Sequence, residues 1–380
     1  MPPVYNGSAA GRNLLLLLHF QHYPMTRKIC RLLFVFTMFA NALLLVQCNS
    51  GTGNGPDVSK VRLELKTSRF DVDLYAIDTN HIGDGLKKLS AKYPDFLDYF
   101  LDTLMAYNIH GNYNDTVGGI REGLKPFLSF KDFVELENFI KREYPDTKQT
   151  DEELTNAFKN LKYYYPSFPA PKIIYVNLGL SKWPAFPLDS TMMCIGLDMF
   201  LGDEFPHYTA IGVPSYMTAH LRKSYIPVSV LSSLYRGFHP FKVDDRTLLD
   251  LMVQRGKEQY FIHKILPNKP DSVLFGFTQK QVDWCNKNEG LIYNFFIQKN
   301  LLYSKEAHTI TPYVTDGPYA VGLESPSAPV KTTPGGIGTW LGYRIVSAYM
   351  EQHPKMTLAE LLNMETEPAR ILDEAKYRPK

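Results

Sequence analysis

The chain is poor in cysteine and has no excess of either charge. Its 380 residues include four cysteines, too few for a disulfide-stabilised scaffold. The 41 basic and 39 acidic residues nearly balance, with no long run of one sign, so the sequence lacks the basic surface of a nucleic-acid-binding protein. Internal repeats, low-complexity tracts and interdomain linkers are also missing after residue 58. We therefore expect one continuous domain at residues 61–380 and no nucleic-acid partner.

The motifs of common hydrolases are missing as well. A gluzincin zinc peptidase carries H-E-x-x-H on one helix and an acidic metal ligand on the next. Residues 226–236 offer hydroxyls where the histidines would lie, and Gln254-Arg255-Gly256 stands where the acidic ligand would lie, although an arginine repels a divalent cation. Ser215 lacks the small flanking residues of a G-x-S-x-G nucleophile elbow. The residues therefore predict no catalytic site, no metal and no cofactor.

Three further features have a structural explanation beside a functional one. Cys194 and Cys285 fall in apolar strand and helix patterns, which predicts buried thiols and leaves a disulfide between them open. Glu289 falls within a predicted helix, either as a buried carboxylate facing a groove or on a solvated face. A glycine cluster lacks the lysine and the preceding strand of a phosphate loop, which favours helix entry and close packing. The cluster comprises Gly335, Gly336, Gly338 and Gly342.

Residues 25–48 have the pattern of an export signal. A basic start is followed by an apolar core at residues 32–46 that is too short to span a membrane comfortably, as in a signal peptide. The segment ends in Leu-Val-Gln-Cys, which resembles the lipobox of bacterial lipoproteins, although a small residue usually stands where Gln47 does. We predict a lipoprotein signal peptide at residues 25–47 and lipidation of Cys48. Ordinary cleavage and an uncleaved anchor are the alternatives.

The segments on either side of this signal complete the predicted N-terminal organisation. Residues 1–24 contain a second apolar run that a signal peptide does not need, so we interpret them as an over-called extension before the true start at Met25. Residues 48–60, rich in glycine and asparagine, are predicted to be a flexible tether. The protein would then be a lipoprotein of the cell envelope that faces the periplasm and contacts the membrane through its N-terminal lipid.

The rest of the sequence has the pattern of a mostly helical α+β domain with a small sheet. Strands are predicted at residues 61–77, as two strands or one with a bend, and at 172–179 and 192–200, with a loop at 183–187. Helices are predicted from residue 84, from Pro94, and at 130–142, 151–165, 226–236, 245–266, 282–296 and 337–350. Expected helix starts are capping boxes of Thr150 with Glu153, Thr278 with Gln281 and Thr357 with Glu360, and a cap at Asp244 or Asp245.

The central stretch, residues 192–267, follows the element order of a gluzincin peptidase without its metal ligands. A strand at 192–200, half-buried through Met193 and alternate residues after it, precedes helices at 226–236 and 245–266. We expect a cleft below the strand edge, where an extended peptide would be captured by main-chain hydrogen bonds. The side chains expected near this groove are Tyr216, Arg222, Tyr260 and Trp340, each of which has core packing as its alternative explanation.

Four blocks along the chain carry a family resemblance. They are IGLDMFLG followed by HY, TLLDLMVQRGKEQYFIHKILP, FTQKQVDWCNKNEG and PGGIGTWLGYRIVSAYM. Together they resemble the GldB family of gliding-motility lipoproteins of Bacteroidetes, over residues 60–380. The sequence departs from common members at Gln254-Arg255, where an acidic residue can stand, and at Gln47.

The resemblance implies a cell-envelope lipoprotein that supports gliding motility and the type IX secretion machinery. It also implies a metallopeptidase-like frame that has lost its metal, with proteins of the gliding and secretion apparatus as partners. We therefore expect non-catalytic protein binding in the groove. The alternative is a cryptic envelope hydrolase that uses a degenerate metallopeptidase-like site.

Overall fold

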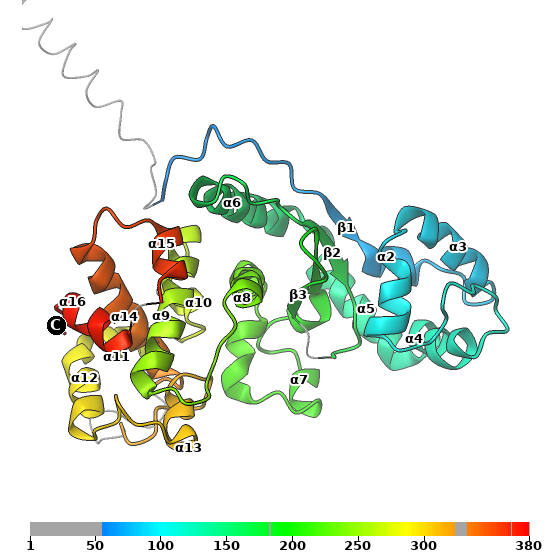
Figure 1. The fold of residues 1–380 in the computed structure, drawn as a ribbon. Coiled ribbons are helices and arrows are strands. Elements are labelled where there is room, and N and C mark those ends of the chain that lie inside the picture. Colours follow the sequence, from blue (N-terminus) through cyan, green and yellow to red (C-terminus); the bar gives the residue numbers. More distant parts are fainter. Residues whose placement is uncertain (1–54, 182–183, 324–332, 366, 380) are drawn as a thin grey trace, which may run out of the picture. The chain divides into compact units, whose positions relative to one another are not determined.

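A four-stranded mixed sheet links the two halves of the described chain (Figure 1). The computed structural model describes residues 55–181, 184–323, 333–365 and 367–379. The predicted extension at 1–24, the signal peptide at 25–47 and Cys48 lie outside these residues. The strand order is β1-β2-β4-β3, in which β1, β2 and β4 are parallel and β3 is antiparallel to β4. The strands are β1 (Thr67–Arg69), β2 (Lys172–Val176), β3 (Ala185–Pro187) and β4 (Met192–Gly196).

Helices cover both faces of this sheet. Ile173 of β2 packs into one hydrophobic core and its neighbour Ile174 into the other. In β4, Met193 and Cys194 divide between the same two cores. Parallel strands are generally buried on both faces in this way, because their crossover connections place helices on each side. The strand predicted at 192–200 is present as β4 over 192–196, but it is buried on both faces and not half-buried. It is also no exposed edge, since it lies between β2 and β3.

One face of the sheet is covered by elements from the first part of the chain. They are α2 (Phe70–Tyr75), α3 (Ile82–Lys92), the π-helices η1 (Tyr99–Leu104) and η2 (Gly119–Leu124), and α4 (Lys125–Ser129). Their core is aromatic, with the ring of Phe70 lying 4.8 Å from that of Phe96 and 4.7 Å from that of Phe100.

The predicted strands at residues 61–77 are reduced to the three residues of β1, followed at once by α2. Phe70 and Leu74 are buried while Val72 between them is exposed. Apolar residues four apart share a face in a helix as well as in a strand, so a short window does not separate the two periods. Asp71 and Asp73 favour the helix because acidic side chains in the first turn interact well with the helix dipole. The loop predicted at 183–187 contains β3, and the helix predicted from Pro94 begins with turns at 94–96, becomes helical at Leu97 and continues as η1.

The other face is covered by longer helices, most of which the sequence predicts. They are α5 (Lys131–Glu143), α6 (Lys148–Tyr164), α8 (Ile226–Phe238) and α9 (Leu248–Ile265). The short elements around them are α7 (His207–Ala210) and the 3₁₀ turns η3 (Leu197–Met199), η4 (Ser215–Leu221) and η5 (Lys223–Tyr225).

Two of these helices begin at residues other than the predicted caps. α6 begins after Thr147, so the predicted capping box does not form: Thr150 is buried within the helix, and the Glu153 carboxylate accepts from Lys269 at 2.8 Å. α9 begins after Thr247, whose hydroxyl oxygen accepts the amide of Asp250 while the Asp250 carboxylate accepts the amide of Thr247. Asp245 has a φ of +55°, a left-handed conformation that cannot start a helix.

The last third of the described chain is almost entirely helical. Its elements are α10 (Asp271–Leu274), α11 (Gln279–Lys287), α12 (Glu289–Gln298), α13 (Ala307–Ile310), the 3₁₀ turn η6 (Thr311–Tyr313), α14 (Ile337–Gln352), α15 (Leu358–Asn363) and α16 (Pro368–Glu374). The predicted capping boxes at Thr278 and Thr357 are confirmed. The single helix predicted through 282–296 is two helices, because Asn288 leaves helical geometry between α11 and α12.

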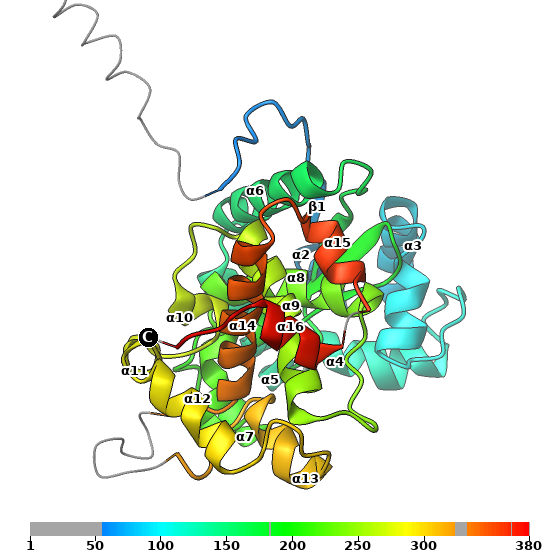
Figure 2. The ribbon, with the colours of Figure 1, turned by 60° about the vertical axis from the view of Figure 1, so that its left-hand side comes forward.

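Helices α9 and α14 cross in close contact (Figure 2). A Cβ added to Gly342 of α14 would lie 1.9 Å from the carbonyl oxygen of Met252 in α9, and one added to Gly256 would lie 2.3 Å from the carbonyl oxygen of Gly342. Gly336, with a φ of +66°, leads into α14. The prediction of helix entry and close packing for the glycine cluster is thus confirmed, as is the α+β class with a small sheet.

Cys194 and Cys285 are both buried free thiols whose pKa is raised by burial, so the disulfide left open by the sequence is not formed. None of the helices in the described part of the chain is long and apolar enough to cross a membrane.

Candidate functional site

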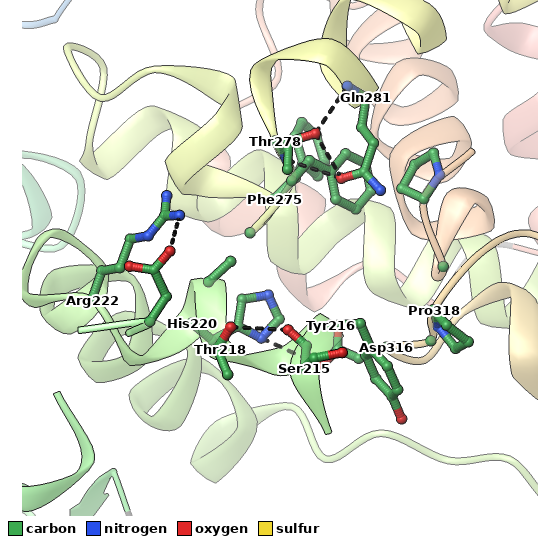
Figure 3. A pocket seen from close by; sticks show the side chains of 17 residues that line it. Ser215, Tyr216, Thr218, His220, Arg222, Phe275, Thr278, Gln281, Asp316 and Pro318 are labelled. Carbon is green, nitrogen blue, oxygen red and sulfur yellow. Dashed lines mark hydrogen bonds and ion pairs between the residues drawn. The ribbon is translucent and has the colours of Figure 1, made fainter. Parts of the chain in front are cut away.

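Two of the predicted groove residues, Tyr216 and Arg222, line one cavity of about 230 Å³ (Figure 3). Both come from η4 and the residue that follows it. The opposite wall is formed by Phe275 and Gln281, before and within α11, while Asp316 lies beside Tyr216. The cavity therefore joins three segments that lie far apart in the sequence.

His220 lies between Tyr216 and Arg222 on this wall. Its ring stacks on Tyr225 at 4.7 Å and its Nδ1 atom lies 3.7 Å from the Asp316 carboxylate. Gly276 opposite has a φ of +67°, and a Cβ there would lie 1.7 Å from Nε2 of His220. Glycine is required at this turn for its backbone conformation and also to leave space for the imidazole.

An ion pair fixes the position of Arg222. Its guanidinium bonds the carboxylate of Asp203, which follows the turn at Gly202 after β4 and η3. The hydrogen bond raises the pKa of Arg222 and lowers the pKa of Asp203. Both side chains are partly exposed, so the pair orients the guanidinium at the cavity wall and adds little to stability.

A second charged cluster joins α8 to α9 near Tyr225. Glu258 is almost fully buried and accepts from Arg236 Nε at 2.8 Å and from Arg255 Nη1 at 2.9 Å. Arg255 also lies over the ring of Phe241 at 3.8 Å. Arg255 stands where the acidic metal ligand of a gluzincin would lie. Its guanidinium is held by the Glu258 carboxylate. Within the described ranges, histidine, cysteine and acidic side chains form no group of three or more that is placed to hold a metal ion.

The other two predicted groove residues lie elsewhere. Trp340 is 1% exposed inside α14, where Arg344 lies 5.8 Å from its ring, so it is a core residue and not a groove residue. Tyr260 is half-buried on α9 beside Lys264, and burial raises its pKa to about 12. The sequence predicts a groove below an open edge of β4. That edge is not open, because β3 already pairs with it.

Some residues of the cavity were not predicted. The sequence gives only a weak signal for Asp203, namely its position in the turn that ends the predicted strand. Asp316 and Gly276 have none, because their roles depend on contacts with His220 across large sequence separations.

Glu289 has a structural role. It is buried at the start of α12, where the Arg344 guanidinium donates two hydrogen bonds of 3.0 and 3.1 Å and the Tyr377 hydroxyl donates one of 2.6 Å. The buried alternative for this carboxylate is confirmed, although it does not line the cavity described above.

Comparison with known protein families shows to which family the chain belongs. A family model described as gliding motility protein GldB matches residues 52–379. This chain belongs to the GldB family. No curated protein and no solved structure matches it. Membership in the GldB family connects the chain with gliding motility and with the cell envelope, and the cavity on η4 lies within the matched region.

Proposed function

We propose that this GldB-family chain is a lipid-anchored envelope protein that supports gliding motility and type IX secretion by binding a partner protein without cleaving it. The anchor would be a lipid on Cys48, and the binding site would be the cavity on η4. The observation that carries the proposal is that this cavity brings Tyr216 and Arg222 together within the region that the family shares.

The chemistry of the cavity suits a segment of a protein chain. Tyr216 is 37% exposed and offers an aromatic face, while the partly exposed Arg222 has five N–H donors of which Asp203 occupies only part. His220 and the hydroxyl side chains of η4 add further polar groups to the wall. An aromatic ring next to an oriented guanidinium is a typical anchor in protein interfaces.

A double variant tests this proposal. Tyr216→Ala with Arg222→Gln should abolish colony spreading and secretion in a gliding strain that depends on the protein, because both anchors are lost. Lipidation should be unchanged. Tm should stay within a few degrees of the parent, because a partly exposed ion pair is worth about 0–1 kcal/mol. Replacing Arg222 by Glu in the same background should give the same loss.

The matched control is Tyr99→Ala with Arg121→Gln. Tyr99 is 39% exposed and Arg121 is exposed, and neither lines the cavity. This control should spread and secrete normally. A folded, membrane-located cavity variant that also functions normally would contradict the binding site, and a purified protein with stoichiometric zinc and peptidase activity would contradict the non-catalytic part.

A further inference from the structure

The first described residues of the chain are packed onto the domain. Residues 55–66 form no strand, but Leu63 and Leu65 pack against the hydrophobic core under the longer helices. A Cβ added to Gly55 would lie 2.5 Å from Cγ of Pro267, which is the second residue after α9. The chain therefore joins the domain next to the C-terminal end of α9.

The connection between Cys48 and this point is short. Gly55 is the seventh residue after Cys48. An extended chain advances by at most about 3.6 Å per residue, so this connection spans no more than about 25 Å whatever its course. A lipid on Cys48 would thus hold the surface around Gly55 close to the membrane. The other end of α9 would lie farther away, since a helix of 18 residues is about 27 Å long.

Two helices, α6 and α9, form the surface around this point. α6 lies beside the start of the described chain in both ribbon views (Figure 1, Figure 2). The side chain of Asn160 in α6 donates to the carbonyl oxygen of Ile265, the last residue of α9, at 2.9 Å. The C-terminal parts of the two helices are therefore neighbours at the place where the chain joins the domain.

Three tyrosines and a lysine of these helices form a cluster that we call the tyrosine surface: Tyr163, Tyr164, Tyr260 and Lys264. Tyr163 is 52% exposed, and its ring lies 5.2 Å from that of Tyr164. The exposed Lys264 lies over the ring of Tyr260 at 5.2 Å. Burial raises the pKa of Tyr164 and the charge of Lys264 opposes this rise, so the lysine is also close to Tyr164. Glu351 of α14 is an acidic neighbour, because its charge adds to the effect of burial on the pKa of Tyr260.

These side chains suit the head-group region of a membrane. Tyrosine has an apolar ring and a polar tip, and it is enriched where membranes meet water. The alkyl stem of a lysine lies along apolar surface while its ammonium reaches lipid phosphates. None of the four side chains lines the cavity on η4, so contact of this surface with lipid leaves the lining of that cavity free.

We propose that the tyrosine surface contacts the phospholipid head groups of the membrane to which the protein is anchored. The short connection brings this surface to the membrane, and the rings and the ammonium then lie among the head groups. The inference rests on the proposed lipid on Cys48, and it adds which face of the domain is turned to the membrane.

Site-specific photocross-linking in the full-length protein in cells tests this contact. The photoreactive residue p-benzoylphenylalanine in place of Tyr163 should form adducts with phospholipids that carry radiolabelled phosphate. In place of Tyr303, which is 64% exposed, it should form none above the level without irradiation. Tyr303 lies at the far end of α9, since the carbonyl oxygen of Leu302 accepts the amide of Leu249 at 2.9 Å. Equal adduct formation at the two positions would overturn the proposal.

Incorporation of an alkyne-labelled palmitate into the same samples reports on the anchor separately. A palmitate-labelled protein that forms no phospholipid adduct at position 163 would overturn the tyrosine surface and leave the anchor standing. A protein without palmitate would overturn the anchor and, with it, the inference that rests on it.

A longer connection separates the affinity of the surface from the effect of the tether. Insertion of about 20 glycine and serine residues after Asn54 gives a long flexible connection, and adducts at position 163 should persist. In this background Lys264→Glu should lower adduct formation at least about fivefold, because one lysine near an anionic lipid surface contributes about this factor. Lys299→Glu, which reverses an exposed charge close to Tyr303 in the sequence, should change nothing. Loss of the adducts on insertion, or no effect of Lys264→Glu, would overturn the proposal.

Discussion

Buried carboxylates gather where the parallel strands end. Asp71 follows β1, Asp198 follows β4, and Asn177, which follows β2, donates to Glu137 of α5 at 3.1 Å. Asp71 is paired with Arg69, whereas one oxygen each of Glu137 and Asp198 accepts no hydrogen bond from the described residues. Burial, with a contribution from the charge of Asp71, raises the pKa of Glu137 to about 7 and that of Asp198 to about 6.

Replacing Glu137 by Gln should change how stability depends on pH. Between the ordinary pKa of 4.5 and the raised pKa of about 7, the folded protein holds a proton that the unfolded chain has released. The free energy of unfolding of the parent therefore falls as pH rises through this window. Glutamine stays neutral, so the variant should gain about 3 kcal/mol relative to the parent between pH 5 and pH 8.

Urea denaturation at a series of pH values measures this difference. Glu135→Gln is the control, since Glu135 lies two residues away on the same helix with an exposed side chain. Its profile should follow that of the parent. Parallel profiles for the parent and Glu137→Gln would show that Glu137 is ionised throughout the window.

At the scale of elements, the contact between α9 and α14 holds the C-terminal helices on the core. It depends on Gly256 and Gly342, whose missing side chains let the two backbones touch. Through α9 the same contact positions Glu258, which ties α9 to α8, and Lys257, which bonds the carbonyl oxygen of Met364 after α15. A change at this crossing is therefore expected to affect the whole helical half.

Gly342→Ala should destabilise the protein by about 1–3 kcal/mol or more, because a Cβ at 1.9 Å from the Met252 carbonyl oxygen forces the helices apart. Gly237→Ala in α8 is the matched control, since a Cβ there meets nothing within 4 Å. Alanine is favoured over glycine in a helix, so the control should be neutral or up to about 1 kcal/mol more stable. Thermal and urea unfolding measure both, and equal stability of the two variants would contradict the close crossing.

At the scale of the whole molecule, we propose that attachment to the envelope depends on the residues before the described domain. No helix of the described residues is suited to span a membrane, and the anchor that we propose is a lipid on Cys48. One acyl chain alone binds a membrane only weakly, so the multiply acylated terminus of a lipoprotein would be needed for stable attachment.

Cys48→Ala should therefore abolish incorporation of an alkyne-labelled palmitate and shift the protein to a soluble or unprocessed form. Cys30→Ala changes another cysteine within the predicted signal peptide and should leave labelling and membrane attachment intact. In-gel fluorescence after click chemistry, with fractionation of the cells, gives both readouts. Undiminished labelling of Cys48→Ala would contradict the lipid anchor.

The sequence by itself determined the features that depend on neighbouring residues. The long helices, the capping boxes at Thr278 and Thr357 and the strand at β2 were predicted with small shifts in their ends. The family blocks were also sufficient to indicate the GldB family. These features could be predicted because hydrophobic periodicity and end capping act over three or four residues.

Only the tertiary structure decided which surfaces meet. Phe70 and Leu74 suit a strand as well as a helix, and the packing of α2 on the sheet selected the helix. Trp340 became a core residue because α14 is enclosed by its neighbours, and β4 became an inner strand because β3 pairs with its edge. The cavity on η4 formed where residues near 203, 220, 276 and 316 converge. Such contacts between distant residues depend on the packing of the whole chain, which local sequence patterns do not encode.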